Sequence, residues 1–278
     1  RSRRQRRCNG FCVWPYVSAE SQTLMSNLPR FHCPTALIPG DALNLPPGTA
    51  RHVQVLRLQP NDEITLFNGQ GGEFKAVVTH MGRSDVSVRV GEQSHIEREL
   101  NMGVHLWSGI TANERMDWLL EKATELGATT LLPITAERSV LKLKGERADK
   151  KLAHWQAIAV ASSEQCGRNR VLQVGTPVNL SQAIAQLSFA PSQAARWVLS
   201  LAPGTRSLQE MMQTLKTSKD GEAKRGEIIL LSGPEGGLSP SEEAQAIAAG
   251  FVPVSLGHRV LRAETAPVAV LSALSCWD

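Results

Sequence analysis

The sequence predicts an α/β protein of two domains, in which a small β-barrel precedes a larger domain with a mainly parallel sheet. Three observations lead to this prediction. Residues 30–93 contain short apolar stretches with a period of two, separated by glycine and proline. At Val104 the apolar period changes, and from there strand-like and helix-like stretches alternate. With 278 residues, the chain is long enough for two domains and a sizeable core.

Residues 25–93 are expected to form the barrel. The apolar run Ile64–Phe67 is followed by Asn68-Gly69, a pair typical of the turn in a β-hairpin. Further along, residues 86–90 alternate strictly between apolar and polar side chains. Short strands at this spacing favour a small barrel. The polar stretch 94–103 interrupts the pattern, and we expect it to link the two domains.

Residues 104–278 are expected to form the second domain. Val104–Ile110 has the composition of a buried strand, and Thr111–Glu114 has the spacing of a capping box before a helix that ends at Gly127. A second capping box, Ser239–Glu242, opens a later helix. The remaining strands are expected at 131–134, 197–201, 228–231 and 252–256, and the remaining helices at 150–166 and 207–215. This alternation implies a parallel sheet covered on both faces.

The net charge of +4 comes from the first 24 residues. They hold five arginines and one glutamate, and the remaining chain has 25 basic and 25 acidic residues. Any affinity of the body for nucleic acid must therefore come from a local patch. An arginine-rich, acid-poor leader resembles an organelle transit peptide. Because Met25 looks like a natural start, however, we expect residues 1–24 to be a tail outside the fold, disordered or not native.

Composition also limits the compartment. No apolar run approaches the roughly 18 residues of a membrane-spanning helix. The cysteines form no CxxC pair and no zinc-like grouping with histidine; they are Cys8, Cys12, Cys33, Cys166 and Cys276. These features predict a cytoplasmic protein with reduced thiols, no metal site and no membrane segment.

Two glycine-containing segments carry the strongest functional signal. Leu231–Ser239 and Leu256–Ala266 each begin where an apolar run ends, and each leads into a helix-like stretch. Adjacent strand-to-helix loops expose free backbone N–H and C=O groups, which suit an adenosine-bearing cofactor. A glycine-rich loop can also be no more than a tight turn. Neither GxGxxG nor GxxxxGK[ST] is present, and Glu235 without a lysine favours a positively charged ligand such as S-adenosylmethionine over a pyrophosphate.

Three separated motifs give the chain a family resemblance. They are Gly233-Pro234-Glu235-Gly236-Gly237, the segment Leu256–Ala266, and Glu164-Gln165-Cys166-Gly167-Arg168. Together they resemble the RsmE family, bacterial methyltransferases for N3 of a uridine in 16S ribosomal RNA. The resemblance covers residues 29–278, including Arg51–Arg57. His258 stands where this family more often has proline.

The resemblance implies a SPOUT α/β trefoil-knot domain after a PUA-like barrel that docks RNA or the ribosome. It also implies a homodimer, S-adenosylmethionine as cofactor, and 16S ribosomal RNA within the 30S particle as substrate. The implied cofactor-binding residues are Leu201, Ala202, Pro203, Ser232, Gly233, Pro234, Glu235, Gly236, Gly237, Leu256, Gly257, Val260, Leu261, Arg262 and Thr265.

Arg262 and Glu264 are the candidate catalytic residues. Uracil N3 carries a proton and is a poor nucleophile until the developing anion is stabilised, which a guanidinium near O2 or O4 could do. Glu264 could accept the proton or orient Arg262. The alternative is that the two side chains form a plain structural ion pair. Cys166 as a covalent nucleophile is disfavoured, because methylation at nitrogen does not require attack on a ring carbon.

Residues 137–170 supply a local positive charge. The segment holds eight basic and four acidic residues, among them Lys142 and Lys144. Such runs are often only solvated surfaces, but here the end of a helix adds polar groups that could contact phosphate and base. The candidate RNA-binding residues are Arg138, Glu164, Gln165, Arg168, Arg170, Arg51 and Arg57.

Two other functions compete with a methyltransferase. A non-catalytic RNA-binding or ribosome-assembly factor could keep the same fold, but we would expect it to have lost the glycine loop or Arg262. A nucleotide-dependent oxidoreductase is disfavoured because the dinucleotide fingerprint and a basic phosphate clamp are absent from the sequence.

Overall fold

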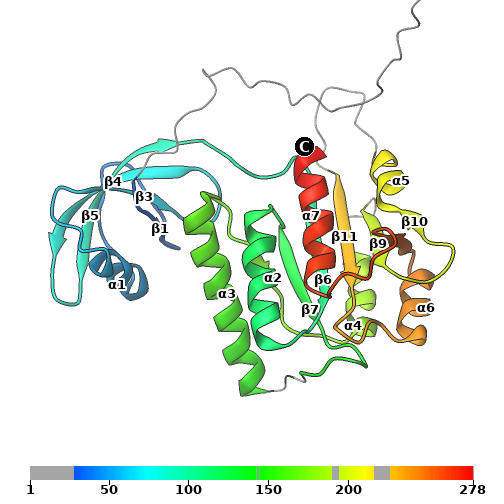
Figure 1. The fold of residues 1–278 in the computed structure, drawn as a ribbon. Helices are drawn as coiled ribbons and strands as arrows, with labels where there is room; N and C mark the ends of the chain where they lie inside the picture. The colour runs from blue at the N-terminus through cyan, green and yellow to red at the C-terminus, as the bar shows by residue number, and fades with distance from the viewer. Residues whose placement is uncertain (1–27, 142, 144, 190–193, 216–225, 278) are drawn as a thin grey trace, which may run out of the picture.

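The computed structural model describes residues 28–141, 143, 145–189, 194–215 and 226–277. The expected tail at residues 1–24 and the side chains of Lys142 and Lys144 lie outside these residues. Figure 1 shows a β-rich N-terminal part joined to a larger α/β part, as the change of apolar period predicts.

The N-terminal part is a five-stranded sheet with the order β1-β3-β4-β5-β2. Every ladder is antiparallel except the one between β1 and β3. Alternate side chains of β5, such as Val86 and Val88, point into a core shared with Phe31 and Leu66. The elements are β1 (Arg30–His32), β2 (Ala42–Asn44), α1 (Pro47–Val55), β3 (Glu63–Phe67), β4 (Glu73–Met81) and β5 (Val86–Ser94).

Two local features of this part differ from expectation. Helix α1 was not predicted, although Pro47 stands in its first turn, where proline is favoured. The β3–β4 hairpin is present, but five residues, 68–72, connect its strands in place of a two-residue turn. Gly69, Gly71 and Gly72 all have positive φ angles there. The connection contacts the second domain through an isolated β-bridge between Gly69 and Arg170.

The second part is a seven-stranded parallel sheet with the order β10-β12-β9-β11-β6-β7-β8. Its strands are β6 (Gly103–Gly109), β7 (Thr130–Ile134), β8 (Gln173–Val174), β9 (Ala195–Leu199), β10 (Arg206–Ser207), β11 (Glu227–Ser232) and β12 (Val252–Ser255). Its helices are α2 (Asn113–Glu125), α3 (Glu146–Cys166), α4 (Leu180–Ala185), η1 (Gln186–Phe189), α5 (Leu208–Gln213), α6 (Pro240–Ala248) and α7 (Thr265–Trp277).

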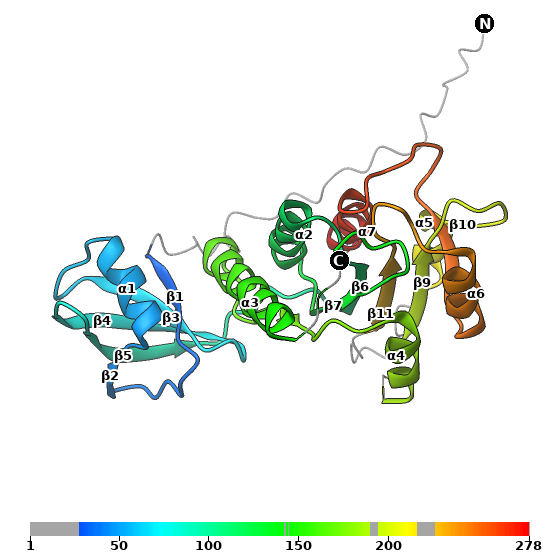
Figure 2. The ribbon, with the colours of Figure 1, turned by 90° about the horizontal axis from the view of Figure 1, so that it is seen from below.

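Helices cover both faces of this sheet, as predicted. Strand residues such as Leu106 and Leu230 pack with α2, α3 and α7 in one core. Their neighbours Trp107 and Leu231 face the other side and pack toward α4 and α6. Figure 2 shows α2, α3 and α7 on one face and α4 on the other. None of the helices in the described ranges is long and apolar enough to cross a membrane.

The last helix returns to the middle of the sheet. α7 follows β12, which lies beside β9 and β10 toward one edge, yet α7 packs against α2 and β11. The connecting segment, residues 256–264, therefore crosses back over the carboxyl ends of the central strands. This crossing places a third loop beside the loops that follow β9 and β11.

The two predicted capping boxes had different outcomes. Ser239 caps α6 and forms the reciprocal bond with Glu242, which confirms the second box. The first box is not formed: Ala112 is the N-cap of α2, without a side-chain cap, and the hydroxyl of Thr111 is buried with no hydrogen-bond partner among the described residues. The α2 N-terminus is instead satisfied from a distant loop, as described below.

Candidate active site

Three loops meet at the carboxyl edge of the parallel sheet. They follow β9, β11 and β12, which are neighbours in the order β12-β9-β11. Ligands of open α/β sheets bind outside the carboxyl ends of strands, where adjacent loops separate. Here the three loops enclose a cavity of about 400 Å³. Figure 2 looks toward this edge of the molecule.

Most of the predicted cofactor residues line this cavity. Those that do are Leu201, Ala202, Ser232, Gly233, Pro234, Glu235, Gly236, Gly237, Leu256, Val260 and Leu261. Pro203, Gly257, Arg262 and Thr265 are not among the lining residues. The lining also includes residues not singled out as cofactor ligands: Arg138, Leu199, Ser200, Leu238, Glu243, Val254, Arg259, Ala263 and Ala266. The position of these residues is thus established, and their contact with a cofactor stays a prediction.

The glycines of the loop after β11 are required by close contacts. A Cβ on Gly233 would lie 2.7 Å from the backbone nitrogen of Leu238, where the loop folds onto itself. A Cβ on Gly236 would lie 3.0 Å from Cβ of Arg138. Gly237 has a φ of +69°, a conformation that favours glycine. The loop is therefore a closely packed turn on the rim of the cavity. A tight turn and a cofactor-binding loop, the two interpretations of these glycines, are thus compatible.

Arg138 holds this loop from one side. Its Nη1 donates to the carbonyl oxygens of Gly236 and Leu238, at 3.1 and 3.3 Å. The side chain was predicted to contact RNA, and it is exposed enough that this stays a prediction. The structure adds a role in shaping the cavity that the charge run alone did not indicate.

Ser200 and Glu243 connect the loop after β9 to α6. The hydroxyl of Ser200 donates to the carboxylate of Glu243, and it accepts the N–H of Ala202 at 3.0 Å. Glu243 lies in the first turn of α6, beside the Ser239 cap. Neither residue was predicted as a site residue, because they lie 43 positions apart and only the sheet topology brings them together.

Glu235 is turned toward the start of α2. Its Oε1 accepts the backbone N–H of Ala112 at 2.9 Å and lies 3.3 Å from Nη1 of Arg115. A carboxylate at a helix N-terminus is stabilised by the free N–H groups and by the helix dipole. The glutamate of the glycine loop therefore replaces the missing side-chain cap of α2.

Arg262 and Glu264 do not form the expected pair. Glu264 is buried, its Oε1 lies 3.9 Å from Nε of Arg115, and its Oε2 has no hydrogen-bond partner among the described residues. Arg262 is exposed, and its carbonyl oxygen accepts the N–H groups of Thr265 and Ala266 at the start of α7. No ion pair joins the two side chains in the described part of the chain. The alternative interpretation, a structural Arg262–Glu264 ion pair, is therefore wrong, and the role of Arg262 in catalysis stays a prediction.

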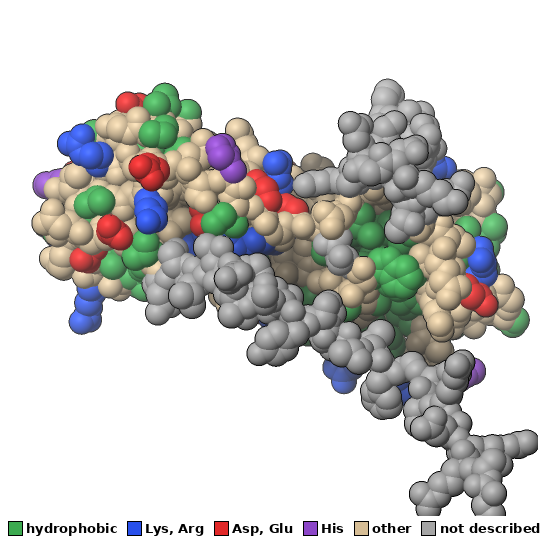
Figure 3. Space-filling model, turned by 90° about the horizontal axis from the view of Figure 1, so that it is seen from above, with side chains coloured by type: hydrophobic (Ala, Val, Ile, Leu, Met, Phe, Trp, Pro, Cys, Tyr) green, Lys and Arg blue, Asp and Glu red, His purple; other side chains and the backbone are tan. Residues whose placement is uncertain are grey.

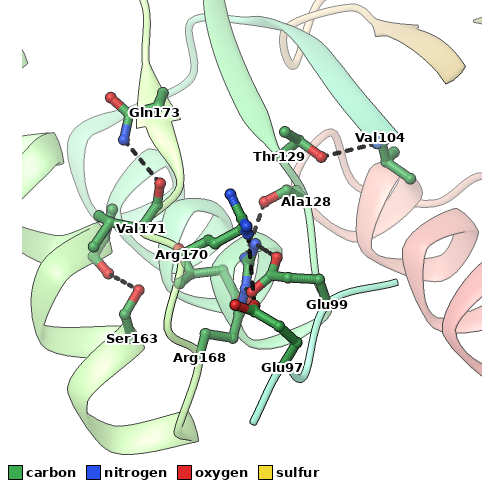
Figure 4. Close-up of polar contacts among 12 residues, drawn as sticks. Glu97, Glu99, Val104, Ala128, Thr129, Ser163, Arg168, Arg170, Val171 and Gln173 are labelled. Atoms are coloured by element: carbon green, nitrogen blue, oxygen red, sulfur yellow. Dashed lines mark hydrogen bonds and ion pairs between the residues drawn. The ribbon is translucent and has the colours of Figure 1, made fainter. Parts of the chain in front are cut away.

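Arg168 was expected to bind RNA, and the structure contradicts this. The residue is 3 % exposed. Its Nε and Nη2 donate to the carboxylate of Glu99, and its Nη1 donates to the carbonyl oxygens of Thr124 and Ala128, at 2.8 and 2.9 Å. Figure 4 shows the guanidinium enclosed by these groups. The chain turns inward at Gly167, which has a φ of 88°, so Arg168 points under the end of α2.

The neighbours of Arg168 in the motif divide into two groups. Glu164 contacts the barrel: its carboxylate accepts the N–H of His32 at 2.8 Å and lies 3.2 Å from Nδ1 of His52. Burial raises the pKa of Glu164, while the His32 N–H and the His52 ring act in the opposite direction. Glu164 thus joins the two domains and does not face RNA. Gln165 and Arg170 are exposed and remain RNA-binding candidates, as do Arg51 and Arg57.

Cys166 is not an activated nucleophile. Burial is the largest influence on its thiol and raises its pKa, so the thiolate form is disfavoured. This agrees with the expectation that no covalent attack on a ring carbon is needed.

The end of the molecule opposite the cavity shows no dominant charge. Figure 3 looks onto that end, where basic and acidic side chains are interspersed over the barrel. This agrees with the balanced charge of residues 25–278.

Two family models match the chain. The RNA methyltransferase domain matches residues 98–275, and the RNA methyltransferase PUA domain matches residues 45–91. Among curated proteins, ribosomal RNA small subunit methyltransferase E from Bacillus subtilis is 31 % identical over 223 residues, which cover 80 % of this chain and 85 % of that protein. The protein of the same name from Synechocystis is 33 % identical and covers 80 % of this chain and 68 % of its own length.

Solved structures agree with these matches. Ribosomal RNA small subunit methyltransferase E from Neisseria gonorrhoeae, bound to S-adenosylmethionine, has a TM-score of 0.78 and 34 % identity, covering 90 % of this chain and 98 % of the other. A Legionella pneumophila protein in complex with the same cofactor has a TM-score of 0.80 and 32 % identity, over 90 % and 98 % of the two chains.

The parallel sheet, the returning last helix and the three-loop cavity, together with these matches, define a SPOUT-class RNA methyltransferase with an N-terminal PUA domain. Within that class, the chain belongs to the ribosomal RNA small subunit methyltransferase E family, RsmE. The predicted fold class and family are confirmed.

Proposed function

We propose that this protein transfers the methyl group of S-adenosylmethionine to N3 of a uridine in 16S ribosomal RNA, with the 30S particle as substrate. The observation that carries the proposal is the cavity at the carboxyl edge, formed by the loops after β9, β11 and β12 in a chain of the RsmE family. We assign catalysis to residues 104–278, docking of RNA or of the particle to the barrel at residues 25–93, and the connection to residues 94–103.

The cavity suits a cofactor with apolar, polar and cationic parts. Its lining includes the apolar residues Leu199, Val254 and Leu256 and the acidic residues Glu235 and Glu243. The closely packed glycine loop brings backbone groups to the cavity surface, where an adenine and a ribose could bond to them. When bound, S-adenosylmethionine supplies a methyl group that its sulfonium already activates, so the protein mainly has to align the reacting atoms.

Arg262 and Glu264 are the proposed catalytic residues. Arg262 is exposed and has no carboxylate partner among the described residues, so its guanidinium can approach a uracil oxygen and stabilise the anionic ring. Glu264 is buried, and one of its oxygens has no hydrogen-bond partner among the described residues; we assign to this carboxylate the acceptance of the N3 proton. In this assignment the two side chains act from separate positions and not as a pair.

The proposed RNA-binding residues are the exposed members of the predicted set: Arg51, Arg57, Arg138, Gln165 and Arg170. Exposed guanidinium groups can contact phosphates and so position the RNA, while the cavity selects the base. Arg168 and Glu164 are left out because the structure commits both to contacts within the protein.

We also propose a homodimer located in the cytoplasm. Large apolar side chains are exposed beside the cavity and at the end of α7: Leu201 is 71 % exposed, Val260 78 % and Trp277 49 %. Exposed large apolar residues favour a protein–protein contact, and Leu201 and Val260 both line the cavity. Sedimentation equilibrium of the full chain is expected to give twice the chain mass, and a monomer at micromolar concentration would contradict this part.

Methylation of isolated particles tests the proposal. The full chain is incubated with S-adenosylmethionine and 30S particles that lack the modification, and nucleosides of the 16S RNA are analysed by mass spectrometry. We expect 3-methyluridine at one position, formed on particles faster than on naked RNA. A non-catalytic assembly factor would bind the particles without forming it. Methylation of another base or atom would show that the cofactor site is right and the target is wrong.

A further inference from the structure

Arg115, in the first turn of α2, contacts two of the three loops that form the cavity. Its Nη1 lies 3.3 Å from Oε1 of Glu235 in the glycine loop. Its Nε lies 3.9 Å from Oε1 of Glu264, at the end of the crossing segment before α7. No sequence motif singled it out, because its two partners lie more than a hundred residues away.

The packing of β6 explains how α2 reaches these loops. A Cβ on Gly109, at the end of β6, would overlap the backbone nitrogen of Pro234, so only glycine lets the strand approach the glycine loop this closely. The chain then enters α2, where the N–H of Ala112 donates to Glu235 at 2.9 Å. Arg115 follows one turn later and reaches the same carboxylate. The start of α2 is therefore fixed against the glycine loop by backbone packing and by charge.

Glu264 requires a positive neighbour. Its side chain is 9 % exposed, and one of its oxygens has no hydrogen-bond partner among the described residues. A buried carboxylate without compensation is costly. Among the described residues, Arg115 is the cation within 4 Å of it, and the Arg115 side chain is 43 % exposed. The two carboxylates thus converge on one guanidinium, and without it their like charges would favour separation of the two loops.

We propose that Arg115 is a positioning residue for the methyl transfer, which holds the glycine loop and the start of α7 together by pairing with Glu235 and Glu264 at once. It acts on the shape of the cavity and so on cofactor affinity. The inference rests on the proposed function only in that the cavity binds S-adenosylmethionine; it does not depend on which nucleotide is methylated.

Cofactor affinity of an Arg115 variant tests the proposal without RNA. We expect Arg115→Gln in the full chain to bind S-adenosylmethionine about tenfold more weakly by calorimetry, the effect of one lost charge-assisted link and of a less ordered loop. Arg115→Lys is expected to recover only part of the affinity. The lysine ammonium keeps the positive charge but lacks the planar guanidinium that reaches both carboxylates. Lys122→Gln is the matched control: Lys122 lies on the same helix and pairs with Glu121 and Glu125 of α2 itself. Its affinity should equal that of the wild type.

Double variants separate positioning from general damage to α2. If Arg115 acts through the two carboxylates, its substitution should weaken binding by no more than about threefold in a Glu235→Gln or Glu264→Gln background, because one of the two contacts is then already broken. Full additivity with both carboxylate variants, or unchanged affinity of Arg115→Gln, would overturn the proposal while leaving the cofactor site intact. Absence of binding by the wild-type chain would instead overturn the proposed function, and this inference with it.

Discussion

Two arginines at the junction between the domains, Arg30 and Arg168, are much more buried than the arginines at the carboxyl edge of the sheet. At the junction, the Arg30 and Arg168 side chains are 8 % and 4 % exposed and bond to Glu73 and Glu99. At the edge, Arg115 is 43 % exposed, and Arg138 and Arg262 are exposed as well. The comparison teaches that an arginine in a functional motif can be structural: Arg168 belongs to a family motif, yet it stabilises the end of α2.

The largest expected effect is the loss of stability caused by Arg168→Ala. Arg168→Ala would leave the buried Glu99 carboxylate and the carbonyl oxygens of Thr124 and Ala128 without their partner. The free energy of unfolding is expected to fall by about 3–5 kcal/mol. Arg170→Ala, two residues on and half-exposed, should change it by less than about 1 kcal/mol. Urea denaturation measures both, and equal stability of the two variants would remove the contrast between buried and exposed arginines.

At the carboxyl edge, Arg262→Ala should act on turnover and leave the fold intact. If the guanidinium stabilises the uracil anion, kcat is expected to fall by about 100- to 1000-fold. Cofactor affinity should change little, because Arg262 does not line the cavity. Single-turnover methylation and calorimetry measure the two effects separately. Normal turnover would show that Arg262 has no role in catalysis and contributes only the backbone contacts at the start of α7.

Gly236→Val tests the shape of the cavity directly. The new side chain must displace Arg138, whose Cβ would be 3.0 Å from the added Cβ. Overpacking of this kind costs about 1–3 kcal/mol, which, if it falls on the cofactor-binding conformation, corresponds to roughly 5- to 150-fold weaker binding of S-adenosylmethionine. Gly226→Val is the control, because none of the described residues has an atom within 4 Å of a Cβ at that position. Equal affinity of the two variants would contradict the geometry of the glycine loop.

The raised pKa of Glu164, at the domain junction, predicts that the stability of the protein depends on pH. Burial raises its pKa above the ordinary value of 4.5, so the folded state holds the proton more strongly than the unfolded state. The resulting stabilisation is complete below pH 4.5 and is lost as the pH rises through the folded-state pKa. Wild type should therefore lose stability relative to Glu164→Gln over that interval. A stability difference that is constant from pH 4 to neutrality would mean that the carboxyl is not shifted.

The smallest expected effect concerns RNA affinity. Arg170→Ala removes one exposed cation, held 3.5 Å from Glu97, and should reduce the slope of log K against log salt by about one, with a modest loss of affinity. Filter binding to 16S RNA at several salt concentrations measures this slope. An unchanged slope would mean that the RNA does not contact Arg170, and would leave Arg51, Arg57, Arg138 and Gln165 as the candidates.

The sequence predicted the fold where a periodic pattern extends over a whole element. The strands β6, β7, β11 and β12 and the α6 capping box follow from apolar runs and local spacing, which tertiary contacts did not override. The capping box predicted at Thr111 is not formed. Instead Glu235, a residue of another loop, accepts the N–H of Ala112 at the N-terminus of α2. Local spacing cannot reveal a partner that the sheet brings from 123 residues away.

The sequence likewise predicted only those parts of the candidate site that local patterns reveal. The loops after β11 and β12 directly follow strands and carry glycine motifs, so the sequence itself indicated them, whereas the loop at Leu201–Pro203 was implied only by the family resemblance. Ser200, Glu243 and Arg115 could not, because each acts through a residue on a distant element. Arg168 shows the converse case. Its charge was visible in the sequence, but its burial depends on Glu99 and on the carbonyl oxygens at the end of α2.

Hydrogen exchange of the full chain with and without S-adenosylmethionine tests the contrast between the two regions most directly. The cofactor should slow exchange in residues 200–205, 232–239 and 256–264, the three loops around the cavity. Residues 95–102 and 164–170, at the domain junction, should exchange at the same rate in both states. Protection at the junction, or none in the three loops, would contradict the assignment of the carboxyl edge as the cofactor site.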